Sequence, residues 1–207
     1  MGVTSERANH WDDAYRRRGA SSVSWFQAQP TVSVELIQML GISPAAAVID
    51  VGGGASSLVD HLLGRGFSDL TVLDISDVAL EEGKRRVGAA APVIWLCQDI
   101  LSWQPKREFA LWHDRAVFHF LTDQNDRETY LRTLRSTLSP DGAVIIATFA
   151  SDGPEMCSGL PVSRYSGLDL GRLLGSGFEV VEKRREEHLT PNGSVQPFTW
   201  VAARRSA

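Results

Sequence analysis

The chain has little cysteine and no long apolar run. Its two cysteines, Cys97 and Cys157, do not build a disulfide framework or a metal cluster, so we predict no metal site and a cytoplasmic location. No apolar stretch approaches the roughly 20 residues of a membrane span. Residues 1–10 are polar and lack the apolar region of a signal peptide. A membrane partner is therefore not expected.

An excess of positive charge is also absent. The formal net charge is −4, and the basic clusters at 16–18 and 183–185 are short enough to be solvated faces. No nucleic-acid partner is therefore expected. The chain is 43% hydrophobic and 22% charged, and its 207 residues suit one well-buried domain, which we assign to 1–207.

What the chain does contain is a strand, a glycine-rich turn and a helix in succession. Residues 46–51 form a short apolar run that includes Asp50 and suits a buried parallel strand. Gly52, Gly53 and Gly54 follow and allow close approach of the backbone to a ligand. Helical spacing then covers 56–63. This order is typical of the first unit of a Rossmann-like nucleotide site, although a plain strand-to-helix turn has the same pattern.

Acidic residues stand at the ends of the next predicted strands. Strand 70–74 ends in Asp74, which lies 20 positions after Gly54. A carboxylate at this place can accept hydrogen bonds from the ribose hydroxyls of a nucleotide. Alternatively, Asp74 caps the following helix. Asp99 follows the third strand, and Asp114 ends the fourth. The remaining predicted elements are helices at 77–87, 122–138 and 167–174, strands at 92–97, 109–114, 143–149, 178–184 and 195–202, and a turn at 139–142.

Two further segments, the leader 1–45 and residues 150–166, lie outside this alternation of strands and helices. In the leader, predicted to form N-terminal helices over 1–45, Trp11 and Tyr15 share one face of a helix. Its aromatic residues either cover the sheet edge or form a lid over a bound ligand. The irregular segment 150–166 is long for a compact domain, which favours a functional loop on the acceptor side. Cys157 within it is either a small buried residue or lies over the acceptor.

Five sequence motifs carry a resemblance to a known family. They are VIDVGGGAS at 48–56, TVLDIS at 71–76, CQDI at 97–100, WHDRAVFHF at 112–120 and LSPDGAVIIATF at 138–149. Over nearly its full length the chain resembles class I S-adenosylmethionine-dependent methyltransferases. The resemblance implies an α/β, Rossmann-like, doubly wound and mostly parallel seven-stranded sheet, a C-terminal antiparallel hairpin and an N-terminal helical lid. A nicotinamide enzyme stays open, because Ser57 is tolerable where that class needs a third small residue.

The resemblance also implies a set of site residues. Asp50, Gly52 and Gly54 would line the amino-acid half of S-adenosylmethionine, Asp74 would hold its ribose, and Asp99 its adenine. The full set expected to bind the cofactor is Trp11, Tyr15, Trp25, Asp50, Gly52, Gly53, Gly54, Asp74, Ile75, Asp99, Ile100 and Asp114. The expected catalytic residues are Asp114, Arg115 and His119.

The expected partner is a small-molecule acceptor, with the protein a monomer or homodimer. No Asn/Asp-Pro-Pro-aromatic motif follows the fourth strand, where 113–116 reads HDRA, so amino-methylation of bases or glutamine is not predicted. Arsenic methylation would need at least three cysteines. A thiol is favoured because, with a pKa of about 8.5, it is already a few per cent thiolate at neutral pH. Arg115 and His119 would add positive potential.

Two alternatives remain open. The leader is similar to that of small protein lysine methyltransferases, with HDRA in the place of their Asp-Lys-Gly. Arg115 and Ala116 depart from that pattern. The other alternative is a regulatory module that binds the cofactor without turnover.

Overall fold

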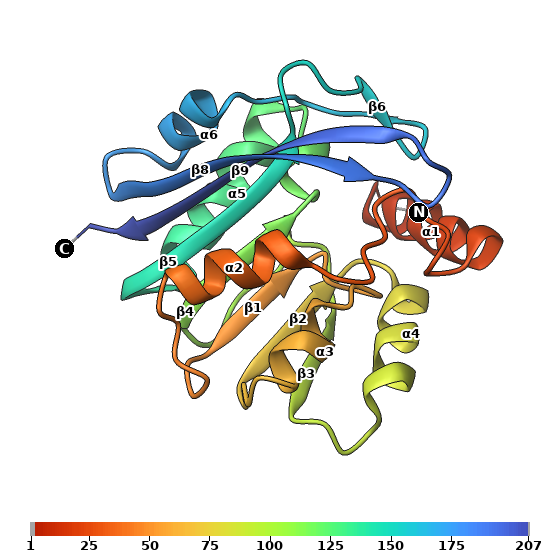
Figure 1. Cartoon of the computed structure of the whole chain (residues 1–207), viewed down its shortest axis with the longest axis horizontal. Helices are drawn as coiled ribbons and strands as arrows, with labels where there is room; N and C mark the ends of the chain where they lie inside the picture. Colours follow the sequence, from red (N-terminus) through yellow and green to blue (C-terminus); the bar gives the residue numbers. More distant parts are fainter. Residues whose placement is uncertain (1–2, 207) are drawn as a thin grey trace.

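The computed structural model describes residues 3–206, which form one seven-stranded sheet in the order β3-β2-β1-β4-β5-β9-β8 (Figure 1). The pairs from β3 to β5 are parallel, and β9 runs antiparallel between β5 and β8. The expected doubly wound sheet with a C-terminal antiparallel hairpin is confirmed. The strands are β1 Val48–Val51, β2 Leu70–Asp74, β3 Val93–Cys97, β4 Phe109–Arg115, β5 Leu138–Phe149, β8 Phe178–Leu189 and β9 Val195–Arg205.

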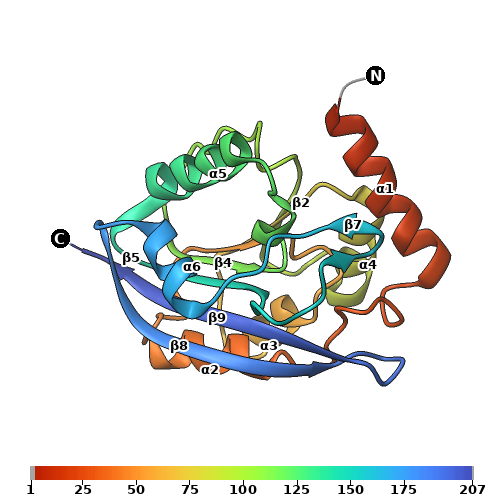
Figure 2. The same cartoon turned by 90° about the horizontal axis from the view of Figure 1, so that it is seen from above.

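Helices cover both faces of the sheet (Figure 2). The core on one face joins α2 and α3 to the sheet, with Leu80 of α4 in the same cluster. The core on the other face joins α5 and α6 to the sheet. Burial on both sides explains why β1 is apolar at most positions and buried at all four. The helices are α1 Val3–Arg18, α2 Thr31–Met39, α3 Leu58–Leu63, α4 Asp77–Val87, α5 Gln124–Thr137 and α6 Gly167–Leu174, with a 3₁₀ turn at Phe118–Phe120.

Several predicted elements differ from the structure at their boundaries. The turn predicted at 139–142 is part of β5. The pairing of β4 with β5 shifts register between Phe109 and Leu111, and residues 139–142 of β5 lie at this irregularity without a partner in β4. Strands β8 and β9 are longer than predicted because each pairs with the other from Val195 to Arg205. The segment 150–166 contains a small hairpin of β6 (Met156–Cys157) and β7 (Leu160–Pro161).

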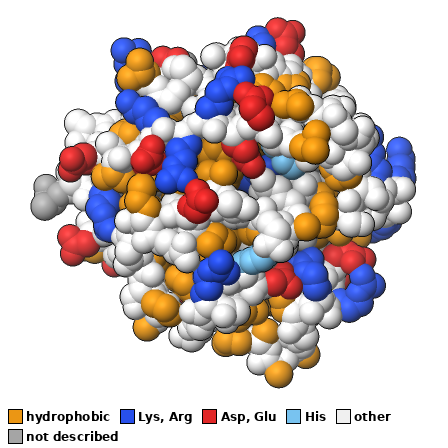
Figure 3. Space-filling model, in the orientation of Figure 1, with side chains coloured by type: hydrophobic (Ala, Val, Ile, Leu, Met, Phe, Trp, Pro, Cys, Tyr) orange, Lys and Arg blue, Asp and Glu red, His pale blue; other side chains and the backbone are white. Residues whose placement is uncertain are grey.

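The surface carries mixed charge. On the face shown in Figure 3, acidic and basic side chains are interspersed rather than gathered in a patch of one sign. Opposite charges also pair along one helix, as Lys84 does with Glu81 in α4. Among residues 3–206, no helix has both the length and the apolar character that crossing a membrane would require.

A buried polar cluster joins the end of β4 to helix α5. Asp114 is fully buried, and its carboxylate accepts hydrogen bonds from the amides of Val117 at 2.8 Å and Phe118 at 3.1 Å. The Tyr130 hydroxyl donates to the same carboxylate at 2.5 Å and accepts from the Trp112 indole at 2.8 Å. Burial raises the pKa of Asp114 to about 6, although these donors oppose the shift. Asp114 therefore anchors the turn that follows β4.

Replacing Tyr130 tests this cluster. Tyr130→Phe leaves a buried indole N–H without its acceptor and a buried carboxylate without one donor, so we expect the free energy of unfolding to fall by about 1–3 kcal/mol. Urea unfolding followed by circular dichroism measures it. Tyr165→Phe is the control, because among the described residues the Tyr165 hydroxyl has no hydrogen-bond partner; its effect should stay within about 0.5 kcal/mol. Equal losses in the two variants would contradict the prediction.

Candidate functional site

A cavity of about 320 Å³ opens at the carboxyl ends of β1, β2 and β4. In a doubly wound sheet this is the edge where ligands bind. The cavity lining is mostly apolar. Of the residues predicted from the sequence, nine lie in its wall: Trp11, Tyr15, Trp25, Gly52, Asp74, Ile75, Asp99, Ile100 and Arg115.

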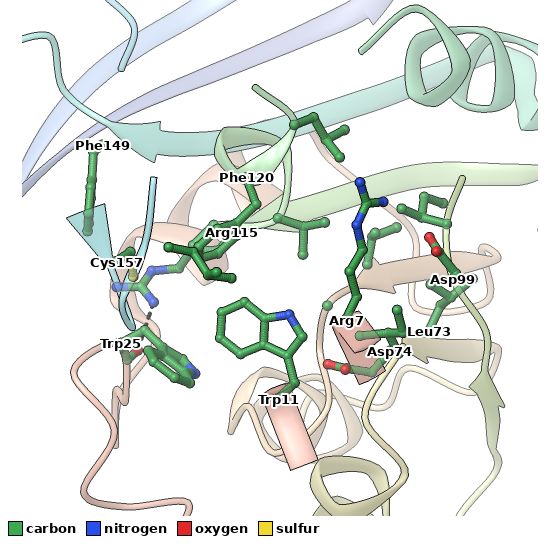
Figure 4. Close-up of a pocket in the computed structure, with 18 of the residues that line it drawn as sticks. Arg7, Trp11, Trp25, Leu73, Asp74, Asp99, Arg115, Phe120, Phe149 and Cys157 are labelled. Atoms are coloured by element: carbon green, nitrogen blue, oxygen red, sulfur yellow. Dashed lines mark hydrogen bonds between the residues drawn. The ribbon is translucent and has the colours of Figure 1, made fainter. Parts of the chain in front are cut away.

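Two carboxylates define one end of this cavity. In Figure 4, Asp74 and Asp99 lie on the same side of the Trp11 indole, with Arg7 close to them. Asp74 is 8% exposed and accepts from the Ser76 amide at 2.8 Å. Burial raises the pKa of Asp74 to about 7, and the nearby negative charge of Asp50 adds to the shift. This end presents hydrogen-bond acceptors.

The glycine-rich turn fits closely around these acidic side chains. A Cβ on Gly54 would lie 2.6 Å from Asp74 Oδ2, and one on Gly53 would lie 2.4 Å from Asp50 Oδ2. Gly52 has a φ of +72°, and a Cβ there would meet Val117 at 2.0 Å. These positions require glycine because a side chain would displace the carboxylates or the turn after β4.

A smaller cavity of about 40 Å³ lies behind the turn, with Asp50 and Gly53 in its wall. Asp50 Oδ1 is 2.7 Å from His113 Nδ1, and His113 Nε2 is 3.0 Å from the Ser33 hydroxyl. Asp50 Oδ2 is buried and has no hydrogen-bond partner among the described residues. An unsatisfied buried carboxylate oxygen beside a glycine turn suits a donor from a bound ligand, such as an amino group.

Helix α1 supplies aromatic side chains to the cavity. The Trp11 ring packs edge-on against Trp25 and Phe120, and the Trp25 indole donates to the Tyr15 hydroxyl at 3.1 Å. The helix is held by Asp12, whose carboxylate accepts from the Ser76 hydroxyl at 2.7 Å and from the Val78 amide at 3.3 Å.

Arg115 lies at the end of the cavity away from Asp74 and Asp99 (Figure 4). Its Nη1 donates to the Trp25 carbonyl at 2.8 Å, and its guanidinium stacks on Phe198 with 4.5 Å to the ring centroid. Burial lowers the pKa of Arg115 to about 10, which still leaves it charged at neutral pH. Ala116 follows with a φ of +74°, a strained conformation for a residue with a side chain.

Three predicted residues do not line either cavity. Gly54 supports Asp74 from behind. Asp114 was expected near the reacting centre, but its carboxylate is turned toward α5 and both its oxygens accept bonds from the protein. His119 is fully buried against Phe149, whose amide donates to its Nδ1 at 3.3 Å. Direct catalytic roles for Asp114 and His119 are therefore not supported by this geometry.

Other residues of the site were missed from the sequence. Asp12 was visible only as part of an aromatic leader, and nothing near it indicated that it would reach Ser76. Phe149 and Phe198 lie in predicted strands, where an aromatic residue indicates only burial. The further lining residues without a sequence prediction include Arg7, Phe120, Leu160, Pro161 and Gln196.

This geometry defines a class of protein first. A parallel sheet with a glycine turn after β1 and acidic side chains at the ends of neighbouring strands is a Rossmann-like nucleotide-binding domain. A family model described as "Methyltransferase domain" matches residues 48–142.

Comparisons with known proteins agree. The mouse eEF1A lysine and N-terminal methyltransferase is 28% identical over 143 residues, which cover 67% of this chain and 20% of that protein. Nodulation protein S of Bradyrhizobium diazoefficiens is 30% identical over 124 residues, 58% of this chain and 57% of that protein. The chain thus spans less than two thirds of either relative. The crystal structure of an S-adenosylmethionine-dependent methyltransferase from Anabaena variabilis superposes with a TM-score of 0.77 at 18% identity, covering 100% of this chain and 96% of that one.

Residues 48–142 carry a methyltransferase domain, and the resemblance to class I S-adenosylmethionine-dependent methyltransferases seen in the motifs is confirmed. S-adenosylmethionine is the cofactor that this family shares.

The attachment of α1 can be tested without any ligand. Asp12→Ala removes the acceptor of the Ser76 hydroxyl and the Val78 amide, so α1 should open more often. We expect amide hydrogen exchange in residues 8–18 to rise at least about tenfold, while exchange in β1 and β4 is unchanged. Asp13→Ala is the matched control, because Asp13 pairs only with Arg16 and Arg17 on its own helix. The same exchange in the two variants would show that Asp12 does not hold the helix.

Proposed function

We propose that this protein transfers the methyl group of S-adenosylmethionine to a small-molecule acceptor with a soft nucleophile, a thiol being the leading candidate. The observation that carries the proposal is a cavity with two unlike ends. Carboxylates lie at one end, and a buried guanidinium among aromatic rings lies at the other. The first end suits the cofactor and the second an acceptor.

The chain's residues fit the cofactor. Asp74 offers a carboxylate oxygen to two ribose hydroxyls, and Ile75 and Ile100 offer apolar surface to adenine beside Asp99. The unpartnered Asp50 Oδ2 suits the cofactor's amino group. In this proposal α1 and the leader up to residue 45 act as a lid over the nucleotide, with Trp11, Tyr15 and Trp25 facing it. Gly52, Gly53 and Gly54 keep the turn close to these acidic groups.

When bound, S-adenosylmethionine supplies a methyl carbon attached to a sulfonium sulfur. The acceptor would react as a thiolate, having lost its proton to solvent, and the sulfonium sulfur would be the leaving group. The chain contributes alignment and an apolar, largely dry cavity, in which an anion gains reactivity. Arg115 favours the thiolate over the thiol by its positive charge. Asp114 acts indirectly, through the turn that it anchors, and Arg115 acts through its charge. We propose no contact between His119 and the acceptor.

The charge at the acceptor end separates this proposal from protein lysine methylation, which one relative's name suggests for that relative. A lysine ammonium must lose a proton and is disfavoured beside a buried guanidinium. The β6–β7 hairpin places Cys157, Leu160 and Pro161 in the cavity wall. We assign this segment to the acceptor side. A cofactor-binding module without turnover is the remaining alternative.

The ionisation of Asp74 gives a prediction for cofactor binding. Hydroxyl donors favour the carboxylate, and burial raises the pKa of Asp74 to about 7 in the ligand-free protein. The affinity for the cofactor is therefore highest above pH 7, where Asp74 is ionised, and it decreases as the pH falls through 7. The Kd of S-adenosylhomocysteine, measured by calorimetry, should fall by about tenfold from pH 6 to pH 8. Asp74→Asn should weaken binding and flatten the profile. A flat profile for the unaltered protein would contradict the ribose assignment.

A transfer assay tests the acceptor. The protein is incubated with methyl-labelled S-adenosylmethionine and, in parallel, with small thiols, amines and carboxylates, or with a cell lysate whose proteins are undermethylated. We expect label in small thioether products, at a rate that increases with pH as the thiolate fraction rises. Label in a protein band would support lysine methylation instead. Cofactor binding without label in any product would support the non-catalytic module.

A further inference from the structure

Arg115 keeps one edge of its guanidinium without a partner. Its Nη1 donates to the Trp25 carbonyl at 2.8 Å. Its Nε and Nη2 are both buried and have no hydrogen-bond partner among the described residues. In arginine, Nη1 lies on the side of Cδ, so Nε and Nη2 share the other edge and direct two parallel N–H groups outward. This pair matches the two oxygens of a carboxylate.

No described acidic group uses that edge. The carboxylate of Glu186 accepts from Gln27 at 2.6 Å and from the Trp200 indole at 2.9 Å. Asp50 is bonded to His113. Cys157 lies beside the guanidinium in Figure 4, but burial raises the pKa of its thiol to about 12, so it is neutral at pH 7. None of these three groups therefore hydrogen-bonds the Nε–Nη2 edge of Arg115, and Asp50 Oδ2 is itself without a hydrogen-bond partner among the described residues.

A buried charge with two unused donors is costly, and proteins rarely keep one without a role. Stacking on Phe198 compensates only part of the lost hydration. Arg115 also belongs to the wall of both cavities, so a ligand in either of them would lie beside its guanidinium.

The surroundings indicate the body of that ligand. Arg115 is flanked by aromatic rings of Trp25, Phe149 and Phe198, which line the cavity with it. The Phe149 and Phe198 rings pack edge-on with 5.0 Å between centroids and give a firm apolar wall. A ligand with an apolar or aromatic body and a negatively charged planar end fits this region.

We propose that Arg115 is a specificity-determining residue: its Nε–Nη2 edge binds the carboxylate of the acceptor, so that the natural acceptor is an apolar or aromatic carboxylic acid that also carries the nucleophile. A single thiolate atom uses only one of the two donors, whereas a carboxylate uses both. The inference rests on the proposed function only in taking this end of the cavity as the acceptor site.

Direct binding tests the proposal without any methyl transfer. The protein is saturated with S-adenosylhomocysteine, and benzoate, phenylacetate and 3-phenylpropanoate are each compared with the corresponding neutral amide by calorimetry. At least one acid should bind roughly 10- to 100-fold more tightly than its amide, the effect of hydrogen bonds to a charged group. Arg115→Gln should remove this difference. Arg115→Lys keeps the charge but not the paired donors and should retain only part of it.

Arg132→Gln is the matched control, because Arg132 is exposed on α5 and bonds only Thr129. Thermal unfolding is measured for each variant to show that it folds. The Kd of S-adenosylhomocysteine should stay within about threefold of the value for the unaltered protein. If Arg115→Gln does not fold, the test uses Arg115→Lys, in which the ratio of acid affinity to amide affinity should be lower than in the unaltered protein.

Three outcomes would overturn the inference. The first is equal affinity of the unaltered protein for each acid and its amide, and the second is a preference for acids that survives in the Arg115 variants. The third is a loss of affinity for S-adenosylhomocysteine instead, which would assign the edge to the cofactor's own carboxylate. Because no turnover is measured, acid selectivity can be found in a protein that methylates nothing. Conversely, thiol methylation without acid selectivity would leave the proposed function standing and remove this inference.

Discussion

Burial of charge at one edge of a parallel sheet is the constraint on which this structure depends. Asp50, Asp74 and Asp114 each lie at or near the carboxyl end of a strand, and each is less than 10% exposed. A carboxylate in such a place must find donors. Asp114 finds them in its own turn and in Tyr130, whereas Asp50 keeps one oxygen unsatisfied. That difference separates a structural anchor from a group poised for a ligand.

The same principle distinguishes the two ends of the cavity. At the end proposed for the nucleotide the chain supplies acceptors, and at the other end Nε and Nη2 of Arg115 are donors without a partner among the described residues. The unpartnered atoms of Asp50 and Arg115 are therefore the groups that we propose a ligand to complement. The apolar wall between them sets a low dielectric in which each such group matters more than it would in water.

Helix α1 couples the leader to the sheet through one side chain. Asp12 bonds Ser76 at the N-terminus of α4, and Ser76 in turn donates its amide to Asp74. The group that holds the helix and the group proposed to hold the ribose therefore share a partner. Opening of the helix and rearrangement of the nucleotide end are expected to be linked for this reason.

The sequence by itself determined the alternation of strands and helices, the glycine turn and the acidic strand ends, because periodicity and turn chemistry are local properties. Helix α4 and strand β2 begin and end where predicted. Tertiary structure decided which way each side chain faces: Asp114 and Arg115 are neighbours, yet successive residues of a strand point to opposite faces, so one anchors α5 and the other enters the cavity. The reach of Asp12 to Ser76 and the meeting of Arg115 with Phe198 likewise depend on packing between segments far apart in the chain, which no local pattern records.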